Sequence, residues 1–368
     1  MKLSDVVNRI NGNVDRFTTD LEYYIGGEHF DSCELEISRK GLIKPNLNIL
    51  GFKFHFAFQE RDVIFMARNP HLRKAGMVFF SGLCSDASYI LRSKNEAILT
   101  QEYLAVMLQS DHFWDYCEAH KVGSVNFAIN WKTMANYEFD LPTIEQQKIV
   151  AEKVWAAYRL KQSYRNLISA TDEIVKSQFI EMFGQVSEDS PCLNDIARVY
   201  DGTHKTPTYT ESGIPFISVE NISDVYGSNK YISNEDYDLY KHKPEYGDIF
   251  MTRIGSIGKC AVYESHDPLA YYVSLALIKP NKDIVHPKFL KYYIESTDGA
   301  LELKKRSLLK AFPMKINLGE IGKIKVIVPA KDKQLEFVKV AEQADKSKFE
   351  LRKSIESIDA VIKSLINS

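Results

Sequence analysis

The chain has 368 residues and a formal net charge of -2; 45% of its residues are hydrophobic and 26% are charged. This composition is ordinary for a globular protein, and the length predicts two or three domains. No apolar run is long enough for a signal peptide or a membrane span. The five cysteines are scattered and form no Cys-x-x-Cys pair. They predict free thiols in a reducing cytoplasm rather than disulfides or a zinc site. Because the net charge is near zero, any basic nucleic-acid-binding surface must be local.

Three blocks of sequence recur in the same order about 187 residues further along the chain. The paired blocks are 3–7 with 193–197, 63–68 with 248–253, and 171–177 with 358–364. A repeat of this length indicates two copies of a whole domain with its connecting element, rather than a solenoid. Two such copies can be related by a pseudo-twofold axis, as dimeric DNA readers are. The alternative is a duplication that serves stability alone.

Two segments are predicted to form long helices. The first, 143–183, has Thr143 and Gln146 at the spacing of a capping box and ends before Gly184, the residue type preferred just past a helix end. The second is 332–367, and its first residue, an aspartate, is the expected cap. Neither segment contains an internal glycine or proline, which is typical of long uninterrupted helices.

The apolar residues of both helices alternate by four and three, which is the pattern of a coiled-coil seam. The predicted seam of the first helix consists of Val150, Val154, Ala157, Tyr164, Ile168 and Val175. The predicted seam of the second consists of Phe337, Ala341, Ala344, Leu351, Ile355, Ile358, Ile362 and Leu365. A lysine interrupts each stripe at the matching place, Lys161 and Lys348. Pseudo-twofold symmetry predicts an antiparallel pair with a domain at each end; the alternative is that each helix packs only on its own domain.

The remaining segments, 1–142 and 185–329, have mixed α and β patterns. Strands are predicted at 61–68, 76–80 and 88–93, with copies at 246–254, 260–264 and 271–279. A short helix follows in each copy, at 100–111 and 287–296. The predicted fold class is therefore α+β, with two mixed α/β domains joined by two long helices.

No catalytic motif is complete in this chain. Residues 255–259 resemble part of a phosphate loop but lack its full glycine spacing, and a cysteine stands where a magnesium-binding hydroxyl is needed. Residues 69–72 lack the second proline and the aromatic residue of the amino-methyltransferase motif. The histidines show no metal-ligand spacing, and no Gly-x-Ser-x-Gly elbow occurs. The sequence therefore predicts neither enzymatic activity nor a metal site.

A glycine-rich turn in the second copy is the first candidate for nucleic-acid binding. It contains Arg253, Ser256 and Lys259. Glycines let a backbone approach a phosphate closely, and the cations neutralise it. The first copy loses the glycines but keeps the cations Arg68, Arg73 and Lys74. The alternative is an ordinary hairpin with solvated charges.

Polar loops near the start of each copy are the second candidate. Their side chains suit phosphate contacts or the reading of base edges. These residues are Asn13, Glu28 and His29 in the first copy, and Thr203, His204, Lys205, Thr206 and Asn221 in the second. The alternative is that they are turn residues satisfying their own backbone.

A basic run in the second copy is the third candidate. It comprises Lys304, Lys305, Arg306 and Lys310. Such a run could follow a phosphate backbone, or it could be a solvated helix face. The first copy is far less basic at the matching place, so the two copies differ in their polar loops while keeping their apolar frames.

The order domain, long helix, domain, long helix resembles the specificity subunit of type I restriction-modification systems. Local runs typical of that family occur at 141–147, 179–184, 214–217, 221–222 and 247–259. The resemblance implies target recognition domains at 1–142 and 185–329, and spacer helices at 143–184 and 330–368 that form an antiparallel coiled coil.

The resemblance also implies the partners. Each recognition domain would read one half of a bipartite site in double-stranded DNA, and the helices would fix the gap between the halves. Two methyltransferase subunits carrying S-adenosylmethionine would dock on the helices, and a motor-nuclease subunit could join them. The chain itself would have no cofactor and no membrane contact. The first domain departs from the family pattern, because its Arg68–Lys74 loop lacks the glycines. The alternatives are a DNA-recognition subunit of another methylation or phage-defence complex, and a coiled-coil scaffold without a DNA role.

Overall fold

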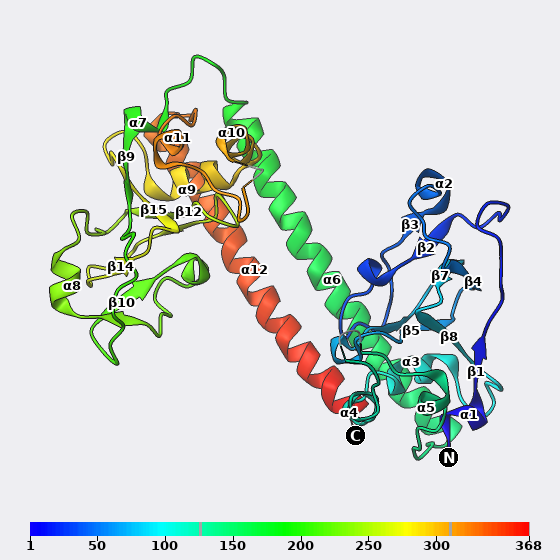
Figure 1. Cartoon of the computed structure of the whole chain (residues 1–368). Helices are drawn as coiled ribbons and strands as arrows, with labels where there is room; N and C mark the ends of the chain where they lie inside the picture. Colours follow the sequence, from blue (N-terminus) through cyan, green and yellow to red (C-terminus); the bar gives the residue numbers. More distant parts are fainter. Residues whose placement is uncertain (125–126, 309–310, 368) are drawn as a thin grey trace. The chain divides into compact units, whose positions relative to one another are not determined.

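The computed structural model describes residues 1–124, 127–308 and 311–367. By its internal contacts the chain divides into two units. The first unit comprises Met1–Asn166 together with Leu351–Ser368, and the second comprises Leu167–Glu350. Each unit therefore combines one mixed α/β domain with part of both long helices (Figure 1).

The elements that begin in the first half of the chain are α1 (Leu3–Val6), β1 (Val7–Ile10), β2 (Tyr23–Ile25), η1 (Gly27–His29), β3 (Gly41–Leu42), α2 (Ile43–Asn46), β4 (Phe54–Phe58), β5 (Val63–Met66), η2 (Pro70–Leu72), β6 (Ala75–Met77), β7 (Gly82–Ser85), β8 (Ser88–Ser93), α3 (Gln101–Met107), α4 (Asp111–Ala119), α5 (Trp131–Ala135) and α6 (Ile144–Phe183). Those that follow are α7 (Leu193–Ile196), β9 (Ala197–Asp201), β10 (Ile214–Ile217), η3 (Val219–Asn221), β11 (Tyr231–Ile232), α8 (Asn234–Asp238), β12 (Ile249–Thr252), β13 (Cys260–Val262), β14 (Ala270–Tyr271), β15 (Leu275–Pro280), α9 (Pro287–Glu295), α10 (Thr297–Arg306), α11 (Leu318–Ile321) and α12 (Lys331–Ile366).

The sequence repeat reappears as a repeat of sheet topology. The order β1-β8-β5-β6 in the first unit corresponds strand for strand to β9-β15-β12-β13 in the second, and all neighbours in both sheets are antiparallel. A smaller sheet accompanies each: β3-β2-β7-β4 in the first unit and β11-β10-β14 in the second. The mixed α/β fold with an internal repeat is thus confirmed.

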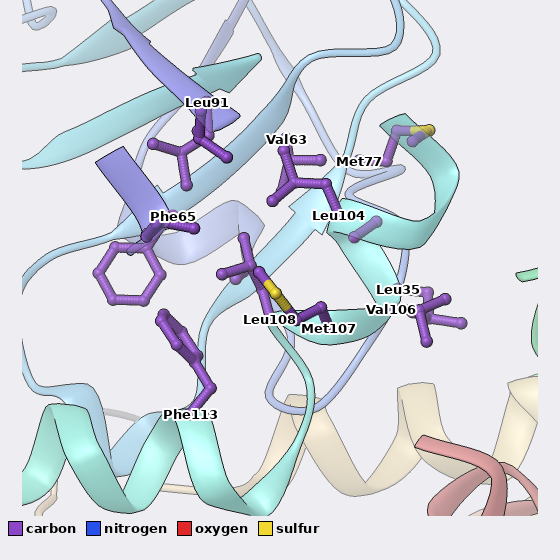
Figure 2. Close-up of a cluster of buried hydrophobic side chains, with 14 of the residues drawn as sticks. Leu35, Val63, Phe65, Met77, Leu91, Leu104, Val106, Met107, Leu108 and Phe113 are labelled. Carbon is purple, nitrogen blue, oxygen red and sulfur yellow. The ribbon is translucent and has the colours of Figure 1, made fainter. Parts of the chain in front are cut away.

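The central strand of each large sheet is buried on both faces. In the first unit, Val63 and Phe65 of β5 pack with α3 and α4 on one face, while Ile64 and Met66 belong to a separate cluster on the other. Figure 2 shows Phe65 and Val63 directed toward the side chains of α3 and α4. This explains why the strand reads as a continuous apolar run rather than an alternating one.

The predicted bounds of the long helices are nearly correct. The Thr143 and Gln146 capping box is confirmed: each backbone N–H donates to the other's side chain, at 3.0 and 3.3 Å. Gly184 adopts φ +71°, as expected after a helix end. The prediction of Asp332 as the second cap is wrong, because α12 begins one residue earlier and places Asp332 in its first turn. An acidic residue there still complements the helix dipole.

One predicted strand was also wrong. Residues 271–279 form two strands, β14 and β15, rather than one. The break occurs because Tyr272 pairs with Thr203 in an isolated bridge, and the Leu275 N–H then turns back to the Tyr272 carbonyl at 2.9 Å. The chain thus leaves the small sheet before it enters the large one.

A fully buried glutamine fixes the start of each long helix to its domain. In the first unit, the Gln147 amide donates to the carbonyls of Ile98 (2.8 Å) and Pro142 (2.9 Å), and its oxygen accepts the Thr100 N–H at 3.1 Å. In the second unit, the Gln334 amide makes the matching bonds at 3.0, 2.8 and 2.7 Å. Its partners are the carbonyls of Ile284 and Pro329 and the N–H of His286.

A second polar contact is repeated within the sheets. In the first unit, the buried carboxylate of Asp62 on the turn before β5 pairs with Arg92 of β8 at 2.7 Å. In the second unit, Asp248 pairs with Lys279 of β15 at 2.7 Å. Both domains therefore contain the same two polar contacts: a buried glutamine at the start of the long helix, and a buried aspartate paired with a cation on the neighbouring strand.

The long helices pack against each other in both units, and they run antiparallel. In the second unit, Asp172 of α6 pairs with Lys348 of α12 at 2.6 Å, and Phe179 packs edge-on against Phe337. In the first unit, Lys161 pairs with Asp359 at 2.7 Å. The two lysines that interrupt the apolar stripes thus each reach an aspartate on the other helix. The two ion pairs are related by the repeat.

All of the predicted seam residues are buried or half-buried. Of these, Val154, Phe337 and Ala341 are almost wholly buried. The assignment of the full set as a coiled-coil seam remains a prediction.

A buried carboxylate joins the first domain to its helices. Glu34 is 8% exposed, and it accepts bonds from Arg165 (2.9 Å), Lys161 (3.2 Å) and Gln162 (3.2 Å) of α6. Burial alone would raise the pKa of Glu34, but Arg165 and Lys161 outweigh it and hold the pKa below the ordinary value of 4.5.

Gln334→Leu is expected to lower the free energy of unfolding by about 2–4 kcal/mol, because it leaves buried backbone groups unsatisfied. Gln147→Leu should have an effect of similar size. Urea unfolding followed by far-UV circular dichroism measures both. The control is Gln343→Leu on the exposed face of α12, which should stay within about 0.5 kcal/mol of the parent. Losses no larger than that of the control would contradict the role assigned to the two buried glutamines.

Glu34→Gln is expected to destabilise the protein by about 1–3 kcal/mol at neutral pH. A carboxyl whose pKa is depressed on folding stabilises above its unfolded pKa and loses this effect as the pH falls through its folded pKa. The difference between variant and parent should therefore shrink below pH 4.5. Tryptophan fluorescence is suitable, since Trp114, Trp131 and Trp155 all lie in the first unit. Glu173→Gln is the exposed control, and a pH-independent difference would disprove the linkage.

Candidate nucleic-acid interface

Two loops of the second unit leave its large sheet at the same edge. Strands β9 and β12 each pair antiparallel with β15, so they run parallel to each other. Ala276 lies opposite both Asp201 and Met251, so β9 and β12 end at the same level. The loops 201–207 and 253–259 therefore emerge side by side, which brings two of the predicted binding features together.

An ion pair joins these two loops. The Arg253 guanidinium contacts the Asp201 carboxylate, and Arg253 Nε donates to the Ile316 carbonyl at 3.3 Å. The other Asp201 oxygen lies 3.0 Å from His204 Nε2. The Arg253 side chain is only 11% exposed. Arg253, which was predicted to contact DNA, therefore links the two loops through a contact inside the domain.

A groove of about 510 Å³ lies beside the 201–207 loop. Thr203, His204 and Lys205 line it, opposite Lys241 and His242. The His242 ring stacks on Tyr200 with centroids 3.6 Å apart. Thr206 is exposed on the same loop.

A second groove, of about 610 Å³, lies between the glycine-rich loop and α10. Ser256, Lys259 and Lys304 line it, so the first and third predicted features meet. Lys305 and Arg306 instead pair with the buried Glu302, at 2.8 and 3.3 Å. Although burial opposes ionisation, these cations keep the pKa of Glu302 below its ordinary value. The prediction for Lys310 falls outside the described residues.

The corresponding edge of the first unit has different chemistry. Strands β1 and β5 are both antiparallel to β8, so the loops after them also share an edge. Arg68 is exposed there, and by sequence Asn11 stands in place of Asp201. Arg73 pairs with Asp111 at 2.5 Å, and Lys74 donates to the Gly27 carbonyl at 2.9 Å. Both cations are thus engaged within the domain.

Several predicted polar residues serve local turns. His29 Nδ1 accepts the Gly26 N–H at 2.9 Å, and burial lowers the pKa of His29. Asn221 accepts the Ser218 N–H at 3.1 Å and so closes η3. The side chains of Asn13 and Glu28 are exposed.

Sequence reasoning missed Asp201, Lys241 and His242. The basic run 241–243 is visible in the sequence, but its position opposite the 201–207 loop depends on the fold. The partner of Arg253 could not be predicted from the sequence either, since it depends on which strands flank β15.

Over the ranges that the structure describes, no cluster of three or more His, Cys, Asp or Glu side chains could hold a metal ion. Nor does any helix there have the length and apolar character needed to cross a bilayer.

The profile of the family described as type I restriction modification DNA specificity domain matches residues 1–165 and 190–358. The chain belongs to this family. It is 26% identical over 202 residues to a protein of Methanocaldococcus jannaschii named as the specificity subunit of the type I restriction enzyme MjaX. That match covers 50% of this chain and 46% of the relative, so the chain spans about half the length of that relative.

Two solved structures have a similar fold. One is the S subunit of a type I restriction-modification system from M. genitalium, with a TM-score of 0.58 and 13% identity over 100% of this chain and 94% of the other. The other comes from a study of complex assembly and conformational transition of the type I R-M system, with a TM-score of 0.58 and 18% identity over 100% and 95%. These structural similarities confirm the overall fold of this chain.

Asp201→Asn is expected to lower the free energy of unfolding by about 2 kcal/mol, because Arg253 loses a charged partner. This substitution gives the second domain an asparagine, the residue type that the first domain has at the matching position, Asn11. Far-UV circular dichroism in urea measures the change. Asp238→Asn, whose side chain is 76% exposed, is the matched control. Equal effects of the two substitutions would show that the Asp201–Arg253 pair does not hold the loops together.

Proposed function

We propose that this chain is the DNA-specificity subunit of a type I restriction-modification complex and has no enzymatic activity of its own. One observation carries the proposal: two sheets of the same strand order present loops of different chemistry at the same edge. Two domains with the same strand order but different loop chemistry are suited to binding two different half-sites. Family membership supports the same function.

The domain assignment follows from this proposal. Residues 1–142 and 185–329 would be the target recognition domains, and 143–184 and 330–368 the spacer helices. Each domain would read one half of a bipartite site in double-stranded DNA, and the helices would set the gap.

The predicted contact residues fall into two groups. Those with exposed side chains are proposed to touch DNA: Asn13, Glu28, Arg68, His204, Lys205, Thr206, Ser256, Lys259 and Lys304. Those bonded within the domain are proposed to position the loops: His29, Arg73, Lys74, Thr203, Asn221, Arg253, Lys305 and Arg306. Lys310 remains a proposed contact from sequence alone.

The helices offer a second apolar face for a protein partner. In the second unit, Leu167 and Ile174 lie one heptad apart on α6 and are 51% and 63% exposed. Such a stripe is suited to another amphipathic helix. The proposed occupants are two methyltransferase subunits that supply S-adenosylmethionine, and a motor-nuclease subunit could join this cytoplasmic complex.

The decisive experiment is co-expression with the methyltransferase subunit of the same system, followed by sequencing of the host DNA for methylated adenines. We expect one bipartite motif with a fixed gap. Replacing residues 185–329 with the second domain of another specificity subunit should change one half-site only. A stable complex without new methylation would contradict the proposal and favour another effector. A chain without any salt-dependent DNA affinity would favour a scaffold.

A further inference from the structure

The groove between the glycine-rich loop and α10 contains two cations that no part of the described protein neutralises. Lys259 and Lys304 are both exposed. Within the described residues, neither ammonium group makes an ion pair or a side-chain hydrogen bond. By contrast, the neighbouring Lys305 is held by Glu302 at 2.8 Å. The loop and the helix therefore each contribute one free positive charge to the same groove.

The fold brings these two lysines together through a close packing contact. Gly258 adopts φ +91°, and a Cβ at this position would lie 2.5 Å from Leu303 of α10. The positive φ favours glycine, and the absence of a Cβ leaves room for the Leu303 side chain against the loop. Because Lys259 follows Gly258 and Lys304 follows Leu303, this contact accounts for the presence of both lysines in the lining of one groove.

The single carboxylate that lines the groove is already engaged. Glu295 accepts the Cys260 N–H at 2.8 Å and pairs with Lys291 at 3.1 Å. The remaining lining is backbone glycine, the Ser256 hydroxyl and apolar side chains such as Ile294 and Leu303. The groove thus contains two lysines without an ion-pair partner among the described residues, and one carboxylate that is already bonded to Cys260 and Lys291.

The lining also indicates which part of DNA would bind. Planar groups such as Arg, Asn and Gln give base reading in the major groove its bidentate geometry, whereas lysine acts as a flexible point charge and carries less geometric specificity. Among the residues that the structure describes, none of those planar groups lines this groove. A hydroxyl, glycine backbone and two ammonium groups are suited to a phosphodiester.

We propose that this groove binds one backbone phosphate of the DNA. The inference rests on the proposed function. In the first domain, the loop cations Arg73 and Lys74 are bonded to Asp111 and to the Gly27 carbonyl, which leaves Arg68 as the exposed cation of that loop.

The test measures binding of the full-length protein to a fluorescent mixed-sequence duplex by anisotropy over a series of KCl concentrations. Lys259→Gln with Lys304→Gln should weaken binding and make the slope of log K against log [salt] shallower by about 1, the value for one neutralised phosphate. The same loss should occur on a duplex carrying the methylation motif, because a phosphate contact is independent of sequence.

Lys323→Gln is the matched control, since it removes the same charge from the same domain but from a lysine that is paired with Glu320 at 2.7 Å. It should leave the slope unchanged. Circular dichroism melting verifies that all variants are folded. Wild-type binding with an unchanged slope in the double variant would overturn the phosphate site alone. A loss confined to the motif duplex would also overturn it, in favour of base reading. No salt-dependent binding by the wild type would overturn the proposed function together with this site.

Discussion

The buried amides of Gln147 and Gln334 determine how each long helix leaves its domain. Each ties the first turn of a helix to the preceding Pro carbonyl and to the segment just before a domain helix. Three bonds to a side chain without solvent contact leave little freedom in that junction. Within each unit, the sheet and its edge loops are consequently oriented with respect to the helix pair, and any function that depends on that orientation depends on these amides.

The long helices and the repeat could be predicted from sequence, since periodicity, caps and internal matches are local signals. The Thr143 capping box and the end at Gly184 are examples. The division of 271–279 into two strands was not predictable, because it depends on the distant partner Thr203. The ion-pair partners of Arg253 and Arg73 could not be predicted either, because these carboxylates lie on another strand and another helix. Residue type identified cations, but only the fold separated those held internally from those left exposed.

The two domains share a repeated sheet with the same buried polar contacts, although their edge loops differ in sequence. The repeated glutamine contacts and the pairs Asp62–Arg92 and Asp248–Lys279 lie in the frame, away from the loops. The exchange of Asp201 for Asn11 alters the loop edge without altering strand order. The contacts that hold the frame therefore involve residues outside the edge loops, so the loops can differ while the apolar core and its buried polar contacts remain.

The composition of the first unit has a consequence for biosynthesis. Ile362 and Leu365 of α12 are partly buried and pack against its core, and Asn367 bonds to Asp111 of α4. These residues are translated after the entire second unit. Residues 362–367 must therefore have emerged from the ribosome before α12 can pack against this core. Until then the nascent first unit lacks part of its apolar packing, and apolar surface that is exposed during folding promotes aggregation.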